Sequence, residues 1–189
     1  MKKIIFLLVL MYAANLNAQL NFGIDIGFNH NDFGTSKIIP TMSTKYITYL
    51  NYTHKHYSIE TFFGYDISLR TKINDITFSK QYHELGLLLG LYKKYPNSSF
   101  FNVAFGGLYR DFSTGDISDF SNNIGITGKI KFGFELSEGI NTGFTFRSFH
   151  DLYNISEYQD KAVLYQSTIC FNMEISLSKL STNIRQKDK

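Results

Sequence analysis

The sequence predicts an all-β protein, specifically an eight-stranded antiparallel up-and-down transmembrane β-barrel. Two observations point to this fold class: apolar and polar residues alternate along most of the chain, and the connections between alternating segments are long and short in turn. Successive side chains of a strand point to opposite faces, so the alternation predicts strands with one apolar and one polar face. We expect strands at residues 20–30, 45–54, 57–69, 79–92, 99–110, 123–136, 140–149 and 162–178.

The first 18 residues have the pattern of a secretory signal peptide and are expected to lie outside the fold. Lys2 and Lys3 precede an apolar run at 4–12, and Ala18 is the small residue at the expected cleavage site. The run is too short to cross a bilayer as a helix, and a buried N-terminal helix is the alternative. Residues 19–179 then form the barrel, and residues 180–189 form a polar C-terminal tail.

The alternation is clear in seven of the eight predicted strands. In the first strand, Leu20, Phe22, Ile24 and Ile26 share one face, while the residues between them are small or polar. The segment 45–54 alternates less regularly. No helical period extends beyond a turn or two, so the sequence predicts no long helix within the barrel.

The lengths of the connections favour an outer-membrane barrel. Long, polar connections are expected at 31–44, 70–78, 111–122 and 150–161, and short ones at 54–56, 93–98 and 137–139. In bacterial outer-membrane barrels the long loops face the exterior and the short turns face the periplasm. We therefore expect outer-membrane localisation, with both chain ends on the periplasmic side.

The size of the apolar residues indicates which face lies outside. The apolar face is built from Phe, Tyr, Leu and Ile, about five per strand, and the interior of an eight-stranded barrel is only wide enough for side chains to fill. Nine strand glycines and most charges lie on the opposite face. We therefore place the apolar face against lipid. A soluble β-sandwich, or a soluble periplasmic barrel that binds an apolar ligand, is the alternative.

With these features the chain resembles small outer-membrane β-barrel proteins of the OmpA/OmpX-like group, in particular those of Bacteroidetes-type bacteria. The resemblance covers the whole mature chain, and the segment 82–92 looks like a strand of that kind. Many such barrels end on an aromatic residue that the assembly machinery recognises. Here residues 179–189 follow the last strand, so we expect either an internal signal at 171–177 or a less typical assembly.

The polar face predicts a network of charges in the lumen. Buried charges must be paired or hydrogen-bonded, because leaving one alone costs several kcal/mol. We expect Glu84, Lys129, Lys131 and Arg147 to interact, and we favour a packed plug over a proton or ion path. The residues assigned to this network are Asp25, Glu60, Asp66, Glu84, Arg110, Lys129, Lys131, Glu135, Arg147 and Glu174.

One group of residues resembles the centre of a hydrolase. Ser148 and His150 share a face near the outer end of the seventh strand, and Glu157 lies in the connection that follows. A Ser-His-acid set at this place could hydrolyse an acyl chain of outer-leaflet lipid A. Lipid A 3-O-deacylases look somewhat similar, but their motif has His first, then Ser two residues on, then Asn. The order here is Ser-Phe-His-Asp, so we expect no catalytic residues and keep the hydrolase as an alternative.

Charge and cysteine content exclude several other classes of protein. The chain has 19 Lys and Arg against 16 Asp and Glu, and removal of the signal peptide takes away two of the lysines. The balance that remains indicates no nucleic-acid partner. A single cysteine cannot form a disulfide scaffold or a Cys-based zinc site, and no phosphate-binding, nucleotide or haem motif is present. We therefore expect no cofactor and no metal.

The sequence thus predicts a structural or surface-binding barrel that acts through its long outer loops. Eight strands leave no aqueous channel, which argues against a wide porin. We expect a monomer whose partners are outer-membrane lipids and lipopolysaccharide. The loops could bind an extracellular ligand, since long loops on a rigid scaffold commonly carry function.

Overall fold

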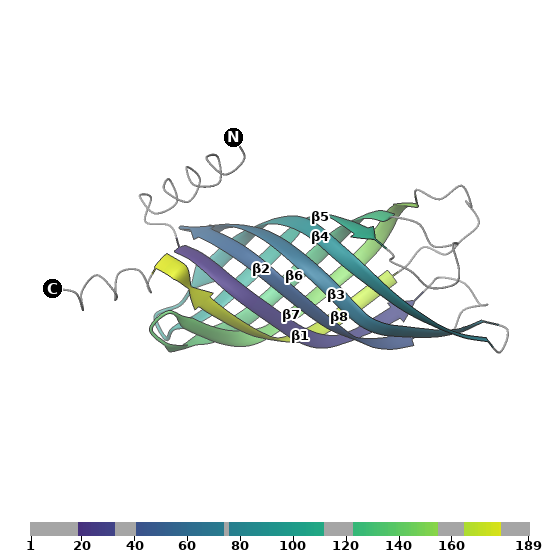
Figure 1. Cartoon of the computed structure of the whole chain (residues 1–189). Coiled ribbons are helices and arrows are strands. Elements are labelled where there is room, and N and C mark those ends of the chain that lie inside the picture. The colour runs from purple at the N-terminus through teal and green to yellow at the C-terminus, as the bar shows by residue number, and fades with distance from the viewer. Residues whose placement is uncertain (1–18, 33–40, 74–75, 112–122, 155–164, 179–189) are drawn as a thin grey trace, which may run out of the picture.

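Eight long strands make up nearly all of the residues that the computed structural model describes, namely 19–32, 41–73, 76–111, 123–154 and 165–178. They are β1 (Gln19–Asp32), β2 (Thr41–His54), β3 (Tyr57–Ile73), β4 (Ile76–Lys94), β5 (Ser99–Asp111), β6 (Asn123–Ser137), β7 (Ile140–Asn154) and β8 (Tyr165–Ser176). Each strand pairs antiparallel with its neighbours in sequence, and β8 closes against β1 (Figure 1). The predicted eight-stranded antiparallel up-and-down barrel is therefore confirmed.

Two of the expected segments, the signal peptide at 1–18 and the tail at 180–189, lie outside the described residues. Within the described ranges, no helix is long and apolar enough to cross a membrane.

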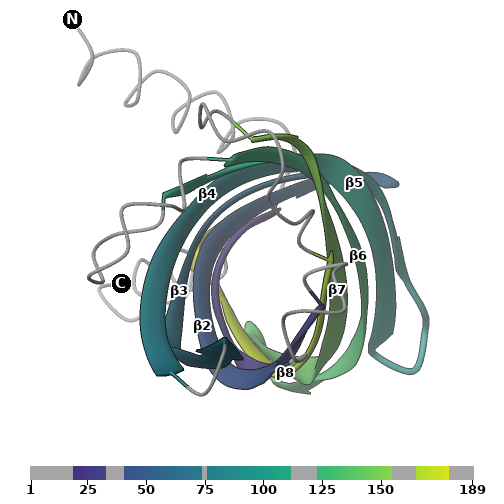
Figure 2. The ribbon, with the colours of Figure 1, turned by 90° about the vertical axis from the view of Figure 1, so that its right-hand side faces the viewer.

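The strand register sets the tilt and the width of the barrel. Following cross-strand partners once around the barrel from Asn21 of β1 leads back to Asn31, ten residues further along the same strand. For eight strands, this offset corresponds to a tilt of about 40° and a backbone cylinder about 16 Å across. Figure 2 shows the strands as a closed ring. Side chains alone can fill a cylinder of this width.

The two ends of the barrel differ in how the strands are connected. Two-residue turns join β2 to β3 and β6 to β7, and residues 95–98 join β4 to β5. Lys55 and Gly139 in the two-residue turns have positive φ angles of 54° and 82°, as tight turns between antiparallel strands require. We call this the turn end, and β1 begins and β8 ends there. The opposite end is called the loop end.

The connection between β3 and β4 differs from the prediction. A long loop was expected at 70–78, but the two strands continue to Ile73 and Ile76 and pair with each other up to that point. The pairing of β3 with β2 stops at Ile67, and that of β4 with β5 stops at His83. The residues beyond form a two-stranded ribbon that projects past the barrel wall (Figure 1). Backbone pairing within a hairpin needs no buried apolar face, so the strands extend into the segment 70–78, in which six of nine residues are polar.

The inward face carries mostly small and polar residues, and at some of its glycines the neighbouring strand leaves no room for a Cβ atom. In β1, Asn21, Asp25 and Asn29 are buried, while the apolar residues between them are exposed. A Cβ atom on Gly106 would lie 1.9 Å from the carbonyl oxygen of Leu87 on the adjacent strand. A larger residue at such a position would force the strands apart.

The outward face forms an apolar belt around the barrel. Its exposed members include Phe22, Ile24, Leu85, Leu87, Leu89, Phe105, Ile130, Phe132, Phe144, Phe146, Ile169 and Phe171. Exposed tyrosines lie towards both ends of the belt, among them Tyr109 and Tyr165 at the loop end and Tyr57 at the turn end. Water-soluble monomers rarely expose contiguous apolar patches larger than a few hundred Å². The belt with its aromatic ends has the organisation of a lipid-facing barrel surface.

Candidate functional site

Charged side chains from all eight strands are buried inside the described part of the barrel. The acids are Asp25, Glu60, Asp66, Glu84 and Glu174, and the bases are Lys45, Arg110, Lys129, Lys131 and Arg147. The formal charges of these five acids and five bases cancel. Nine of them are arranged in three groups along the barrel, described here from the loop end to the turn end. The tenth, Asp66, accepts a hydrogen bond from Ser43 Oγ at 2.8 Å.

The group nearest the loop end is centred on the carboxylate of Glu84. Lys45 Nζ lies 2.5 Å from Glu84 Oε2, and the guanidinium of Arg110 forms an ion pair with Oε1 of the same carboxylate. Gln166 Oε1 accepts hydrogen bonds from Lys45 Nζ at 2.9 Å and from Arg110 Nη2 at 2.8 Å. The guanidinium also lies over the ring of Phe149, 3.8 Å from its centroid. Glu84 thus balances part of the charge of two buried cations.

The middle group is centred on Glu60. This carboxylate forms an ion pair with Lys129 and accepts a hydrogen bond from Arg147 Nη2 at 3.0 Å. Arg147 Nη2 also lies 3.7 Å from Asp25 Oδ2, and its guanidinium lies over the ring of Phe62 at 4.2 Å. Because β7 and β3 lie on opposite sides of the eight-stranded ring, the contact between Arg147 and Glu60 crosses the lumen.

The group nearest the turn end joins Glu174 to Lys131 in an ion pair. The hydroxyl of Tyr49 accepts a hydrogen bond from Lys131 Nζ at 2.8 Å and donates one to Glu174 Oε2 at 3.3 Å. Lys131 Nζ also lies 4.8 Å from the centroid of the Tyr49 ring and 5.4 Å from that of Phe100. Since Lys131 belongs to β6 and Tyr49 to β2, this contact also joins opposite walls of the barrel.

The structure places nine of the ten residues assigned to the lumen network on the buried inner face. The exception is Glu135, which forms an ion pair with Lys94 and accepts a hydrogen bond from the amide of Gly139 at 3.0 Å, both at the turn end. The four residues expected to interact are divided among the three groups: Glu84 lies in the first, Lys129 and Arg147 in the second, and Lys131 in the third.

Three members of these groups were not predicted from the sequence: Lys45, Tyr49 and Gln166. Lys45 and Tyr49 lie on β2, where the alternation is least regular because Ile47 and Tyr49 also point inward. Lys45 and Tyr49 are separated from the polar residue Asn51 by even numbers of residues, so all three point to the same side of the strand. This shared side is the signal that could have identified them. Gln166 lies on the polar face of β8 but is uncharged, and nothing in the sequence connects it to Arg110.

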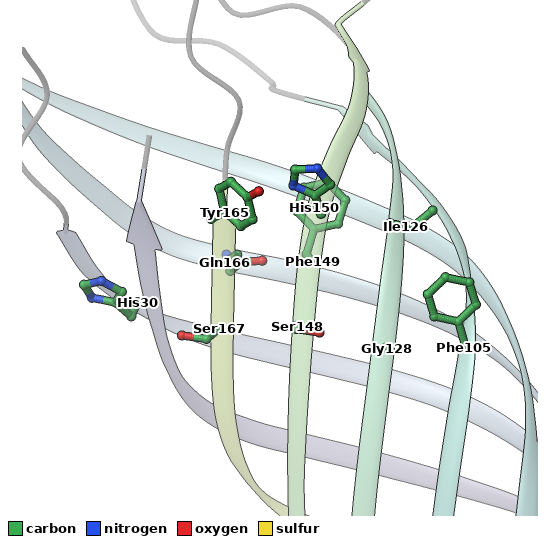
Figure 3. Close-up of a pocket in the computed structure, with 10 residues that line it drawn as sticks. All are labelled: His30, Phe105, Ile126, Gly128, Ser148, Phe149, His150, Tyr165, Gln166 and Ser167. Atoms are coloured by element: carbon green, nitrogen blue, oxygen red, sulfur yellow. The ribbon is translucent and has the colours of Figure 1, made fainter. Parts of the chain in front are cut away.

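A second candidate site is a pocket of about 650 Å³ on the outer face near the loop end (Figure 3). Ser148 and His150 both line it, as the shared parity predicted. The ring of His150 packs at a tilt against that of Tyr165, with 4.4 Å between ring centroids, and no hydrogen bond joins His150 to Ser148. Glu157, the proposed acid, lies outside the described residues. The described part of the pocket therefore holds a serine and a histidine without the contact that would activate the serine.

Metal binding has no candidate among the described residues, since no three His, Cys, Asp or Glu side chains are grouped to hold an ion. The single cysteine, Cys170, is buried on the inner face of β8.

Comparison with known proteins gives matches in structure only. No protein-family model matches the sequence, and no curated protein matches it. Neisserial surface protein A superposes with a TM-score of 0.65 at 6% identity, covering 85% of this chain and 99% of that one.

Two further solved structures are similar. The outer membrane protein OprG of Pseudomonas aeruginosa gives a TM-score of 0.52 at 14% identity, over 82% of this chain and 95% of that one. Ail, the attachment invasion locus protein of Yersinia pestis, gives 0.53 at 7% identity, over 84% and 99%. Identities this low establish the fold alone and leave the expected Bacteroidetes-type resemblance untested. The chain has the fold of the small eight-stranded outer-membrane β-barrel proteins.

Proposed function

We propose that this chain is an outer-membrane barrel with a sealed lumen, and that it serves as a structural or surface-binding protein. The observation that carries the proposal is the set of contacts that cross the lumen. Arg147 reaches Glu60, and Lys131 reaches Tyr49, from opposite sides of the ring. With the charges balanced and the rings of Phe62 and Phe149 packed over the guanidiniums, the interior is a cross-linked core, and we expect it to leave no path for water.

A surface-binding role is supported by analogy with one similar structure. Ail is described as an attachment invasion locus protein and was crystallised with the heparin analogue sucrose octasulfate. This analogy concerns the fold and not the site. The loop segments expected to bind a ligand, at 33–40, 112–122 and 155–164, lie outside the described residues.

The first test asks whether the chain is a closed barrel in the outer membrane. The full chain is expressed, outer membranes are isolated, and the detergent extract is run on an SDS gel with and without boiling. We expect a fast-migrating band that shifts to lower mobility on boiling. Soluble periplasmic protein without a shift would contradict the proposal and favour the soluble ligand-binding barrel.

The second test asks whether the lumen is sealed. Purified wild-type protein in a planar lipid bilayer is expected to give no stable conductance steps. The matched control is the double variant Glu60→Ala/Arg147→Ala, which removes the contact across the middle of the lumen and shows whether the assay detects an opened barrel. Stable conductance through the wild type would overturn the sealed lumen.

Orientation can be tested by labelling introduced cysteines in a Cys170→Ala background. A membrane-impermeant maleimide is expected to label Ser118→Cys on intact cells, because the connection between β5 and β6 leaves the barrel at the loop end. It should label Lys55→Cys, in the exposed turn after β2, only after the outer membrane is permeabilised. The reverse pattern would invert the proposed orientation.

The alternative of an outer-leaflet lipid hydrolase requires Ser148 and His150 to act with an acid, and the described residues contain no hydrogen bond between the two. Mass spectrometry of lipid A from cells that express the wild type or His150→Ala tests it directly. Loss of an acyl chain with the wild type and its retention with the variant would establish the hydrolase.

A further inference from the structure

One row of residues interrupts the apolar belt on the outer face. Residues at the same register position on neighbouring strands form a row at right angles to the strands. The interrupting row runs over β5, β6, β7, β8 and β1 and consists of Phe105, Gly128, Ser148, Ser167 and His30. Its three central residues are small, and the two serines are polar, whereas most of the outer face is built from large apolar side chains.

Larger side chains border this row on both sides. On the side towards the turn end, the adjacent row is Ile130, Phe146, Ile169 and Phe28. On the side towards the loop end, it is Ile126, His150 and Tyr165. The three small residues are therefore the floor of a furrow between two walls, which is the pocket in Figure 3. A Cβ atom on Gly128 would meet nothing closer than Ser148 Oγ at 3.5 Å, so the floor is open.

The barrel geometry gives the furrow its length and direction. Five strands are separated by four inter-strand spacings, so the row is about 19 Å long. A circuit through β2 to β8 advances the register from Asn21 to Asn31, towards the loop end. Because the strands are tilted, the row from Phe105 to His30 also climbs by about 12 Å along the barrel axis. The furrow thus runs obliquely from the middle of the belt to the loop end, and its length is comparable to that of a fatty acyl chain.

The polar groups of the furrow need partners that a plain hydrocarbon chain cannot supply. The side-chain hydroxyls of Ser148 and Ser167 face outward, and neither has a hydrogen bond in the described structure. Nδ1 of His150, in the wall, is shielded from solvent and also lacks a partner among the described residues. A hydroxyl left without a hydrogen bond in an apolar environment costs about 1–3 kcal/mol. An occupant that brings an oxygen atom to the floor would remove this cost.

We propose that the furrow binds one acyl chain of an outer-leaflet glycolipid, and that Ser148 and Ser167 hydrogen-bond to a hydroxyl on that chain. The occupant is a lipid because the furrow opens onto the lipid-facing belt. It is a lipid of the outer leaflet because the furrow rises to the loop end, which faces the exterior in barrels of this kind. The inference rests on the proposed outer-membrane location and adds the ligand class and the residues that hold it.

The first experiment fills the furrow. Full-length protein is purified from outer membranes in mild detergent, incubated with lipid A, and examined by native mass spectrometry. We expect one bound lipid A on the wild type and a bound fraction about tenfold lower on Gly128→Leu, because the new side chain occupies the floor. The matched control is Gly107→Leu. Gly107 is also outward-facing with an open Cβ direction, its nearest atom being Gly125 O at 3.8 Å, but it lies beside Ile126 in the row of the wall and not on the floor of the furrow.

The second experiment removes the hydroxyls and keeps the space. The variant is Ser148→Ala/Ser167→Ala, and its control is Thr48→Ala/Thr61→Ala, which removes two exposed hydroxyls from β2 and β3. Binding of lipid A is compared with binding of a phosphatidylethanolamine whose chains carry no hydroxyl. We expect the wild type to prefer lipid A, and the serine double variant to lose about tenfold in that preference, the equivalent of one net hydrogen bond. The threonine variant should keep the preference.

Several outcomes would overturn the inference. They are a wild type without bound lipid A, equal loss of binding in Gly128→Leu and Gly107→Leu, or an unchanged preference in the serine double variant. Each sample is also tested for heat modifiability. A wild type that never forms a heat-modifiable outer-membrane barrel refutes the proposed function itself. A heat-modifiable barrel without lipid A refutes only the furrow inference.

Discussion

Glu60 is the residue whose removal should most disturb the lumen. Its carboxylate holds Lys129 in an ion pair and accepts a hydrogen bond from Arg147, and all three side chains are almost fully buried. In Glu60→Gln the shape of the side chain is kept but its charge is lost. Arg147 keeps Asp25 at 3.7 Å, whereas no other carboxylate is found to pair with Lys129 among the described residues. Removing one member of a buried ion pair costs about 3–5 kcal/mol. Because Arg147 retains a partner, we expect a loss near the lower value.

The assay is unfolding of the purified barrel by urea in lipid vesicles, with the free energy of unfolding as the readout. The matched control is Glu135→Gln, which breaks the partly exposed pair with Lys94. Exposed pairs contribute less than about 1 kcal/mol, so this control should change the free energy little. A rescue variant, Glu60→Gln/Lys129→Met, removes the unpaired cation as well. It should recover most of the loss, because the cost arises from a buried charge without a partner.

Two results would refute this reasoning. If Glu60→Gln were as mild as Glu135→Gln, the lumen would be hydrated enough to screen Lys129, and the sealed interior would be wrong. If the double variant were less stable than Glu60→Gln alone, the lost packing of Lys129 would outweigh its unpaired charge.

Burial and the close approach of strands lead to three further predictions. Leu87→Arg, near the middle of the outward face, should lower the free energy of unfolding by about 2–4 kcal/mol, and Leu91→Arg, towards the turn end, by only about 0–1 kcal/mol. Equal costs in urea titrations would show that the belt does not contact the bilayer core. Gly106→Val should abolish the heat-modifiable band, because its Cβ would overlap the Leu87 carbonyl, whereas the neighbouring outward-facing Gly107→Val should keep it. If both variants kept the heat-modifiable band, β4 and β5 would have to lie further apart at Gly106 than the structure shows. Cys170, which is 1% exposed, should react with a maleimide only after unfolding, and rapid labelling of the folded barrel would contradict a closed lumen.

Local sequence pattern was sufficient to predict most of the barrel. Period-two alternation in β1 placed Phe22 outside and Asp25 inside, because strand geometry assigns successive side chains to opposite faces whatever the tertiary context. The bulk of the apolar face then identified the outside, since eight strands cannot enclose that many large side chains. Ser148 and His150 were placed on the outer face for the same reason.

The sequence-based prediction failed at three places where the local pattern of residues does not indicate their position in the barrel. On β2, Lys45, Ile47 and Tyr49 share the inner face, so the strand lacks the contrast between faces that marks the others. Beyond Ile67 and His83, the strands β3 and β4 are held by pairing with each other, and most residues of the segment 70–78 are polar. Glu135 has the parity of a lumen residue, yet its position beside the turn gives it Lys94 as a partner.

Side-chain period and size were enough to assign the strand number, the inward and outward faces, and most of the charges that enter the lumen. Which of these charges meet depends instead on how the barrel closes. The ten-residue advance of the register brings Arg147 opposite Glu60 and Lys131 opposite Tyr49. It also aligns Gly128, Ser148 and Ser167 from three strands into one furrow. Pairings across a closed barrel depend on this global offset between strands, which no single segment of the sequence encodes.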